Sequence, residues 1–117
     1  MNPPDPESFL PLTAPEYHVL LALGDDALHG YAMMQALDEK TGGREALLPG
    51  TLYATVARMV KRGLLDELDA PPEPDADRRR RYYRVSALGR AVARAESARL
   101  RRLLAVAERE SLVPGES

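Results

Sequence analysis

The sequence predicts a mainly α-helical domain with one small β-hairpin. Two observations lead to this fold class. Apolar residues recur at helical spacing in four segments, three of them before residue 64 and one after residue 86. Between the third and fourth segments, two short stretches of alternating side chains flank a proline-rich acidic loop, a pattern typical of a hairpin. The chain has 117 residues, which suits a single domain.

Composition excludes several classes of protein. The chain has no cysteine, and its only two histidines, His18 and His29, cannot form a metal site by themselves. No apolar run approaches the roughly 20 residues that span a bilayer. The N-terminus has no basic segment followed by an apolar one, as a secretory signal would. We therefore expect a cytoplasmic protein without a metal, a cofactor or a membrane partner.

The charge distribution is more informative than the total charge. A net charge of -2 argues against a nucleic-acid-binding protein when it is considered alone. However, the cations gather at residues 58–62 and 78–84, whereas acids collect at residues 66–77. Binding depends on the local field within a Debye length of about 8 to 10 Å. A mildly acidic protein of this kind is able to present a strongly basic face.

The first helix follows a proline-rich start. Residues 1–12 contain four prolines and are predicted to form a flexible N-terminal lead-in. Thr13 is a helix cap, and Glu16, three residues later, completes the pattern of a capping box. The apolar residues between Tyr17 and Leu23 surround much of the helix, so we expect it to be central and buried.

The second helix is expected from His29 and Gly30 to about Thr41, where a pair of glycines ends it. A catalytic role for His29 would need a partner nucleophile or a metal, and none is suitably spaced, so a structural or phosphate-facing histidine is favoured. Asp25 and Asp26 are adjacent in a turn, which favours capping and solvation over acid-base chemistry. We assign no catalytic residue.

The third helix is predicted to have one apolar and one basic face. Pro49 and Gly50 break the preceding segment, Thr51 is expected to cap the helix, and Gly63 is expected to end it. The outer face contains no acid and is formed by Thr51, Ala54, Thr55, Arg58, Lys61 and Arg62. A DNA major groove suits this face, and the alternative is a set of solvated cations on a surface helix.

The hairpin is expected to consist of a strand at residues 64–68 and a return strand at residues 80–85. A two-stranded hairpin is unstable alone, so it must lie against the three helices. Three helices followed by such a hairpin make a winged helix-turn-helix domain, expected over residues 13–85.

A C-terminal dimerisation helix is predicted at residues 86–113, capped by Ser86 and running from Ala87 to about Ser111, with a tail at 114–117. Such a helix extends roughly 37 Å, longer than the domain covers. Burying five of its apolar side chains is worth about 5 kcal/mol before ordering costs, so a second copy of the helix is the expected cover. The predicted homodimer interface comprises Phe9, Leu10, Leu100, Leu103, Leu104, Val106 and Ala107.

Four segments resemble the PadR family of bacterial winged-helix transcriptional regulators: LTAPEYHVLLAL, LHGYAMMQALDEKTGG, LLPGTLYATVARMVKRGLLDE and RRRRYYRVSALGR. The resemblance implies a homodimer that binds operator DNA, usually as a repressor, and that a small ligand or stress signal releases. The chain is similar to the short branch with a single C-terminal helix. That branch leaves the ligand site open, either at the dimer interface or absent.

DNA contacts are assigned to residues of the third helix and the hairpin. Thr51 suits a phosphate oxygen, whereas Thr55 and Arg58 are expected to reach base edges. Tyr53 fits either the core or a phosphate contact. Lys61 and Arg62 are expected to touch the DNA backbone. Contacts from the hairpin to phosphate or to a minor groove are expected from Arg78, Arg79, Arg80 and Arg81. The alternatives are pairing of these arginines with Asp75 or Asp77 and, for the whole protein, a winged-helix module that binds proteins instead of DNA.

Overall fold

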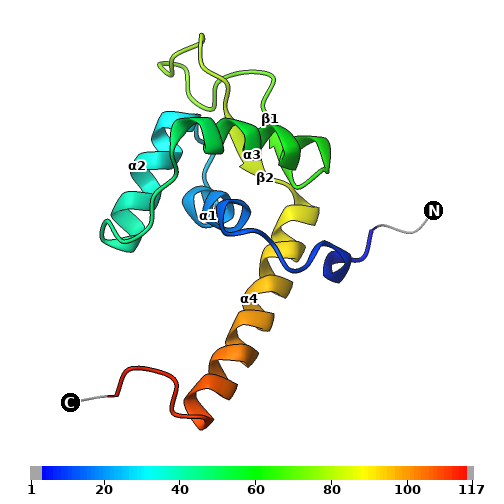
Figure 1. Cartoon of the computed structure of the whole chain (residues 1–117). Coiled ribbons are helices and arrows are strands. Elements are labelled where there is room, and N and C mark those ends of the chain that lie inside the picture. Colours follow the sequence, from blue (N-terminus) through cyan, green and yellow to red (C-terminus); the bar gives the residue numbers. More distant parts are fainter. Residues whose placement is uncertain (1–3, 116–117) are drawn as a thin grey trace.

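The computed structural model describes residues 4–115 and confirms the mainly helical fold with a two-stranded hairpin (Figure 1). Residues 1–3 of the predicted lead-in and 116–117 of the predicted tail lie outside the described residues. In chain order the elements are a 3-10 helix η1 (Pro6–Phe9), α1 (Ala14–Leu23), α2 (Gly30–Thr41), α3 (Pro49–Lys61), β1 (Leu65–Glu67), β2 (Tyr83–Val85) and α4 (Ala87–Arg109).

Helix α1 lies at the centre of the domain, as its apolar circumference predicts. It packs against α2, α3, β2 and α4. Val19 and Leu23 are fully buried in a core that includes Met33 of α2, Leu52 of α3 and Val92 of α4. All four helices therefore share one apolar core, and α1 is the element around which the other three are placed.

The capping box of α1 is confirmed. The Thr13 hydroxyl accepts a hydrogen bond from the Glu16 N–H at 3.2 Å, and the Glu16 carboxylate accepts one from the Thr13 N–H at 2.8 Å. The sequence did not indicate that Glu16 is only 3% exposed. A carboxylate this deep in the domain needs further partners, which the neighbouring helix supplies.

The start of α3 differs from the prediction. The helix begins at Pro49, its N-cap is Leu48, and no side chain caps it. Thr51 therefore lies inside the first turn, and its predicted capping role is wrong. Proline suits the first helical position because its ring fixes φ and its missing N–H would have no partner there. The predicted end is confirmed, since Gly63 has a φ of 80° and Leu64 N–H donates to the Met59 carbonyl at 2.9 Å.

The hairpin is antiparallel, with Leu65 opposite Val85 and Glu67 opposite Tyr83. Its return strand begins at Tyr83 instead of residue 80, because Asp77 folds the preceding residues into a turn. The Asp77 side chain accepts from the Arg79 N–H at 2.9 Å, and its carbonyl accepts from the Arg80 N–H at 3.3 Å. We call residues 68–82, between the two strands, the wing.

A close backbone contact fixes α4 against the hairpin. The Ser86 hydroxyl caps the helix by accepting from the Gly89 N–H at 2.9 Å, as predicted, and donates to the Gly63 carbonyl at 2.6 Å. A Cβ atom on Gly89 would lie 2.0 Å from the Leu64 carbonyl oxygen, so only glycine fits there. The start of α4 is thus locked to the end of α3.

Residues 4–12 of the predicted flexible lead-in are packed against the domain. Helix η1 packs against α4, and the Leu12 N–H donates to the buried Glu96 carboxylate at 2.7 Å. Phe9 and Leu10 are half-buried against the domain's own core. They therefore have partners within the chain. Because both side chains keep part of their surface exposed, their place in the dimer interface stays a prediction.

The C-terminal half of α4 extends away from the domain (Figure 1). The radius of gyration is 15.9 Å, above the roughly 13 Å expected of a compact domain of this length. Leu103 is 54% exposed and Leu104 52% exposed, whereas Val92 at the start of the helix is fully buried. Among residues 4–115, no helix combines the length and the apolar character that crossing a membrane requires.

Candidate nucleic-acid interface

The outer face of α3 and the wing lie at the end of the molecule opposite the C-terminal half of α4 (Figure 1). Small residues occupy much of this face of α3, where Gly50, Ala54 and Ala57 are exposed between longer side chains. Small side chains let a helix backbone approach a ligand closely. Ala54 was expected on the outer face, but the sequence pattern did not assign a role to these small positions.

Thr55 does not lie on this face. It is 2% exposed, and it turns toward the core with Leu52, Val56 and Met59 at helical spacing. Its predicted contact with a base edge is wrong, because the packing of α3 on α1 rotates the helix so that position 55 faces inward. Neighbouring positions on a helix differ by about 100° in direction, so a small rotation changes which residues face out.

The exposed positions at the start of α3 are consistent with a phosphate contact. Thr51 is exposed, and the first-turn N–H groups of α3 receive no side-chain cap. Uncapped N–H groups and the positive end of the helix dipole favour an anion at this position. Tyr53 is 58% exposed, so its alternative placement in the core is wrong.

An acid does reach the basic end of α3, although α3 itself contributes none. The buried Glu16 carboxylate lies 3.2 Å from the Arg62 guanidinium and 4.0 Å from Nε of Arg58. The Arg62 guanidinium also stacks 4.7 Å above the Phe9 ring. Arg62, predicted to contact the DNA backbone, is therefore held by partners on two sides. Lys61 is exposed and forms no ion pair within residues 4–115.

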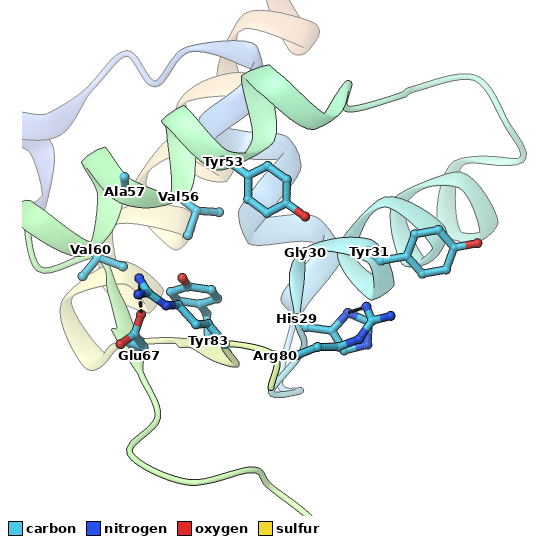
Figure 2. Close-up of a pocket in the computed structure, with 11 residues that line it drawn as sticks. His29, Gly30, Tyr31, Tyr53, Val56, Ala57, Val60, Glu67, Arg80 and Tyr83 are labelled. Carbon is cyan, nitrogen blue, oxygen red and sulfur yellow. Dashed lines mark hydrogen bonds and ion pairs between the residues drawn. The ribbon is translucent and has the colours of Figure 1, made fainter. Parts of the chain in front are cut away.

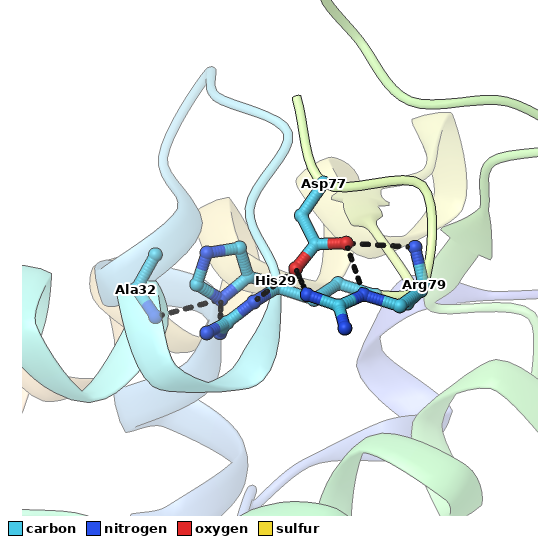
Figure 3. A network of polar contacts seen from close by, with 5 residues as sticks. His29, Ala32, Asp77 and Arg79 are labelled. Atoms are coloured by element: carbon cyan, nitrogen blue, oxygen red, sulfur yellow. Dashed lines mark hydrogen bonds and ion pairs between the residues drawn. The ribbon is translucent and has the colours of Figure 1, made fainter. Parts of the chain in front are cut away.

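Some of the wing arginines form ion pairs with acidic side chains. Pairing with Asp77 was one of the alternatives to DNA contact that the sequence left open. Arg79 forms two hydrogen bonds to the Asp77 carboxylate, at 3.2 and 3.3 Å (Figure 3). Nε of Arg80 lies 3.5 Å from the same carboxylate, and Arg81 lies 3.9 Å from Glu67. The hydrogen bonds from Arg79 hold the pKa of Asp77 below its usual range. Arg78 is exposed and has no ion pair within the described residues.

His29 connects the wing to α2. Its Nδ1 accepts from the Ala32 N–H at 3.1 Å, capping α2, and lies 3.1 Å from the Arg80 guanidinium (Figure 3). Both contacts require Nδ1 to carry no proton. Burial lowers the pKa of His29, and the nearby positive charge of Arg80 lowers it further. The favoured structural role of His29 agrees with these contacts, whereas its contact with the wing was not foreseen.

A pocket of about 530 Å³ lies between α3, the start of α2 and the wing. Tyr53 projects from α3 toward Gly30, while His29 and Arg80 form another wall (Figure 2). A Cβ atom on Gly30 would lie 2.8 Å from the Tyr53 ring, so glycine lets this ring cover the start of α2. His29 and Arg80 come together here although 51 positions separate them, and no signal in the sequence groups them.

Comparison with protein families gives a match over residues 19–95, to the model of the transcriptional regulator PadR-like family. A curated relative is an uncharacterised 37.1 kDa protein in transposon TN4556 of Streptomyces fradiae, 43% identical over 51 residues. That match covers 44% of this chain and 14% of the relative. The chain therefore spans only a small part of that protein.

Solved structures share the fold. A PadR family transcription regulator from Clostridium difficile superposes with a TM-score of 0.70 at 20% identity, covering 83% of this chain and 97% of that one. A PadR-like transcription factor from Bacteroides fragilis superposes with a TM-score of 0.64 at 22% identity, covering 80% of this chain and 86% of that one. RosR of H. salinarum superposes with a TM-score of 0.58 at 25% identity, covering 90% of this chain and 99% of that one.

Proposed function

The chain belongs to the PadR-like family of transcriptional regulators, and from this premise we propose that it binds operator DNA as a homodimer and represses transcription until a small ligand or stress signal releases it. Members of this family are transcription regulators and not enzymes. The observation that supports DNA binding most directly is the exposed outer face of α3 beside an arginine-rich wing.

In the proposed complex, α3 enters the major groove and the wing lies along the adjacent backbone. Arg58 reaches base edges, since its side chain is 49% exposed and its terminal nitrogens form no hydrogen bond within the described residues. Thr51 and Tyr53 contact phosphate, as does Lys61. In the wing, the phosphate or minor-groove contacts come from Arg78, Arg79, Arg80 and Arg81. Arg62 contributes less to DNA contact because it is already held by Glu16 and Phe9.

The proposal of a homodimer rests on the exposed apolar side chains in the C-terminal half of α4. Leu100, Leu103, Leu104 and Val106 are exposed, and Ala107 is half-buried. Leu103, Val106 and Ala107 lie on the helix face whose first half, at Val92, is buried on the chain's own domain, and Leu100 and Leu104 lie beside that face. An apolar face of this length is costly to leave in water, and an identical helix is the complementary cover.

Ligand release is proposed to act where α1 meets α4. A groove of about 410 Å³ lies there, lined by small residues of α4 and by Arg90, Arg94 and Arg101. Arg90 pairs with Asp25 at 2.6 Å, whereas Arg94 and Arg101 form no ion pair within residues 4–115. Because α4 joins the dimer helix to the DNA-binding head, a ligand in this groove would change the distance between the two heads of a dimer.

Salt dependence tests DNA binding. Contacts to about 6 to 10 phosphates per dimer should lower operator affinity by about 10³ to 10⁵ between roughly 50 and 200 mM salt. The measurement is fluorescence anisotropy with a duplex that the protein selects from a random pool. Equal binding at both salt concentrations would contradict the proposal and favour the alternative, a winged-helix module that binds proteins.

Assembly is tested by substitution on α4. Leu103→Glu with Leu104→Glu should convert a dimer into a monomer of 12.9 kDa and abolish operator binding. The matched control is Ala87→Glu with Ala105→Glu, which places the same charges on exposed positions of the same helix, away from the apolar face and outside the groove. An unchanged mass on light scattering for the leucine variant would exclude this interface.

A further inference from the structure

Glu16 carries a charge that its capping role does not require. A capping box works with either glutamate or glutamine at this position, since only an acceptor oxygen is needed. One oxygen, Oε1, accepts from the Thr13 N–H at 2.8 Å. The other oxygen, Oε2, points across to the end of α3, where both Arg58 and Arg62 face it. The negative charge of this buried side chain is therefore directed at α3.

Arg62 and Arg58 meet this carboxylate differently. Arg62 donates to Oε2 at 3.2 Å and lies over the Phe9 ring, so it is fixed by two contacts. Arg58 approaches only with Nε, at 4.0 Å, and half of its side chain remains exposed. The two terminal nitrogens of an arginine are the groups that pair with guanine O6 and N7. Glu16 thus faces the Nε side of Arg58, and the two terminal nitrogens of Arg58 stay accessible.

We infer that Glu16 is a specificity-determining positioning residue, which acts on DNA through Arg58 without touching DNA itself. This inference rests on the proposed DNA-binding function. A free arginine binds any phosphate, so it raises affinity for all duplexes alike. A buried negative charge behind Arg58 opposes such contacts on every sequence. The contact of the restrained guanidinium with a base edge is retained only on the correct sequence. Specificity is the difference in binding free energy between the correct sequence and the others.

Glu16→Gln separates charge from shape, because glutamine keeps the acceptor that caps α1. We expect the ratio of random-duplex to selected-duplex Kd to fall about tenfold, with tighter binding to random duplex. The matched control is Glu39→Gln, which removes the same charge from an exposed position of α2 without an ion pair in the described residues. Glu39→Gln should leave the ratio unchanged. An unchanged ratio in Glu16→Gln, or an equal fall in both variants, would overturn the inference.

A double-mutant comparison tests whether the effect passes through Arg58. In an Arg58→Ala background, Glu16→Gln should no longer change the ratio of the two affinities. If it lowers the ratio there as much as in the parent, Glu16 acts through general stability or charge. Thermal unfolding of each variant identifies a stability effect, since a merely structural glutamate would lower Tm without changing the ratio.

A measurement without DNA keeps failure of this inference distinct from failure of the proposed function. Nitrogen-15 NMR of the wild-type protein measures the exchange of the Arg58 Nε–H with water. We expect slower exchange than for the exposed Arg78, and faster exchange after Glu16→Gln. If Arg58 in the wild type exchanges as fast as Arg78, Glu16 does not restrain it, whatever the protein binds. If exchange is slow but no duplex binds, the proposed function fails instead.

Discussion

The end of α3 and the wing both concentrate arginines, but the acids that face them differ in burial. At α3, one carboxylate that is 3% exposed faces two guanidinium groups from another helix. In the wing, Asp77 pairs with Arg79, whose side chain is 91% exposed, two positions along the same loop. A buried carboxylate keeps one position in the domain, whereas an exposed local pair contributes little to stability and is screened by salt.

In the proposed complex with DNA, this difference divides recognition between the two regions. At α3, Arg62 is held by Glu16 and Phe9, and Arg58 faces the same buried carboxylate, an arrangement that suits base contacts that depend on geometry. The wing arginines exchange an exposed carboxylate for a phosphate at little cost, so they suit contacts that depend on charge. Two predictions test this division, with the largest effect expected at α3, and a third tests the contact between the wing and α2.

Arg58→Ala should lose discrimination by about 1 to 3 kcal/mol, the worth of one good base contact. The measurement is the Kd for the selected duplex and for a random duplex at one salt concentration. Lys61→Ala is the matched control, because Lys61 lies one turn later on the same exposed face and should weaken both duplexes alike. Equal losses on both duplexes for Arg58→Ala would remove the distinction between α3 and the wing.

Asp77→Asn should tighten binding to every duplex severalfold, because it frees Arg79 and Arg80 from their carboxylate. Asparagine retains an oxygen for the Arg79 N–H, so the turn is preserved. The salt dependence of log Kd should steepen by about 1 for each additional phosphate that the freed arginines neutralise. Tighter binding to the selected duplex alone would instead assign the wing a part in reading sequence.

The smallest effect concerns pH. The pKa of His29 is lowered in the folded protein by burial and by Arg80. The unfolded chain therefore binds the proton more readily. The stabilising contribution of neutral His29 is present above pH about 6.5 and is lost as pH falls through the lowered pKa.

The check is Tm between pH 5 and pH 8 for the wild type and for His29→Asn, since asparagine also caps helices. The wild type should lose more Tm on acidification than the variant. Parallel curves for the two proteins would show that His29 does not couple the wing to α2.

The local signals in the sequence were sufficient for the order and type of the elements. The capping box at Thr13, the Ser86 cap and the Gly63 stop each depend on residues within about four positions of one another, and all are present in the structure. Apolar periodicity likewise identified which stretches are helical. These features follow from backbone chemistry that is local in the chain, so a single sequence contains them.

Positions that depend on packing between elements were predicted less well. Thr55 and Phe9 were both placed at the surface of an interface, and the structure buries the first and gives the second a partner within the chain. The exposed C-terminal half of α4 was predicted correctly, because its extension beyond the domain depends only on the length of that helix. The approach of Glu16 to Arg58 and Arg62 was not foreseen.

The sequence by itself determined a winged helix with cations gathered at α3 and in the loop after it. Only the tertiary structure decided which of those cations are restrained, because Glu16 and Arg62 are 46 positions apart and meet only when α1 packs on α3. The rotation of α3 about its axis was decided in the same way. Both depend on how side chains fill the space between helices, which periodicity along one chain does not specify.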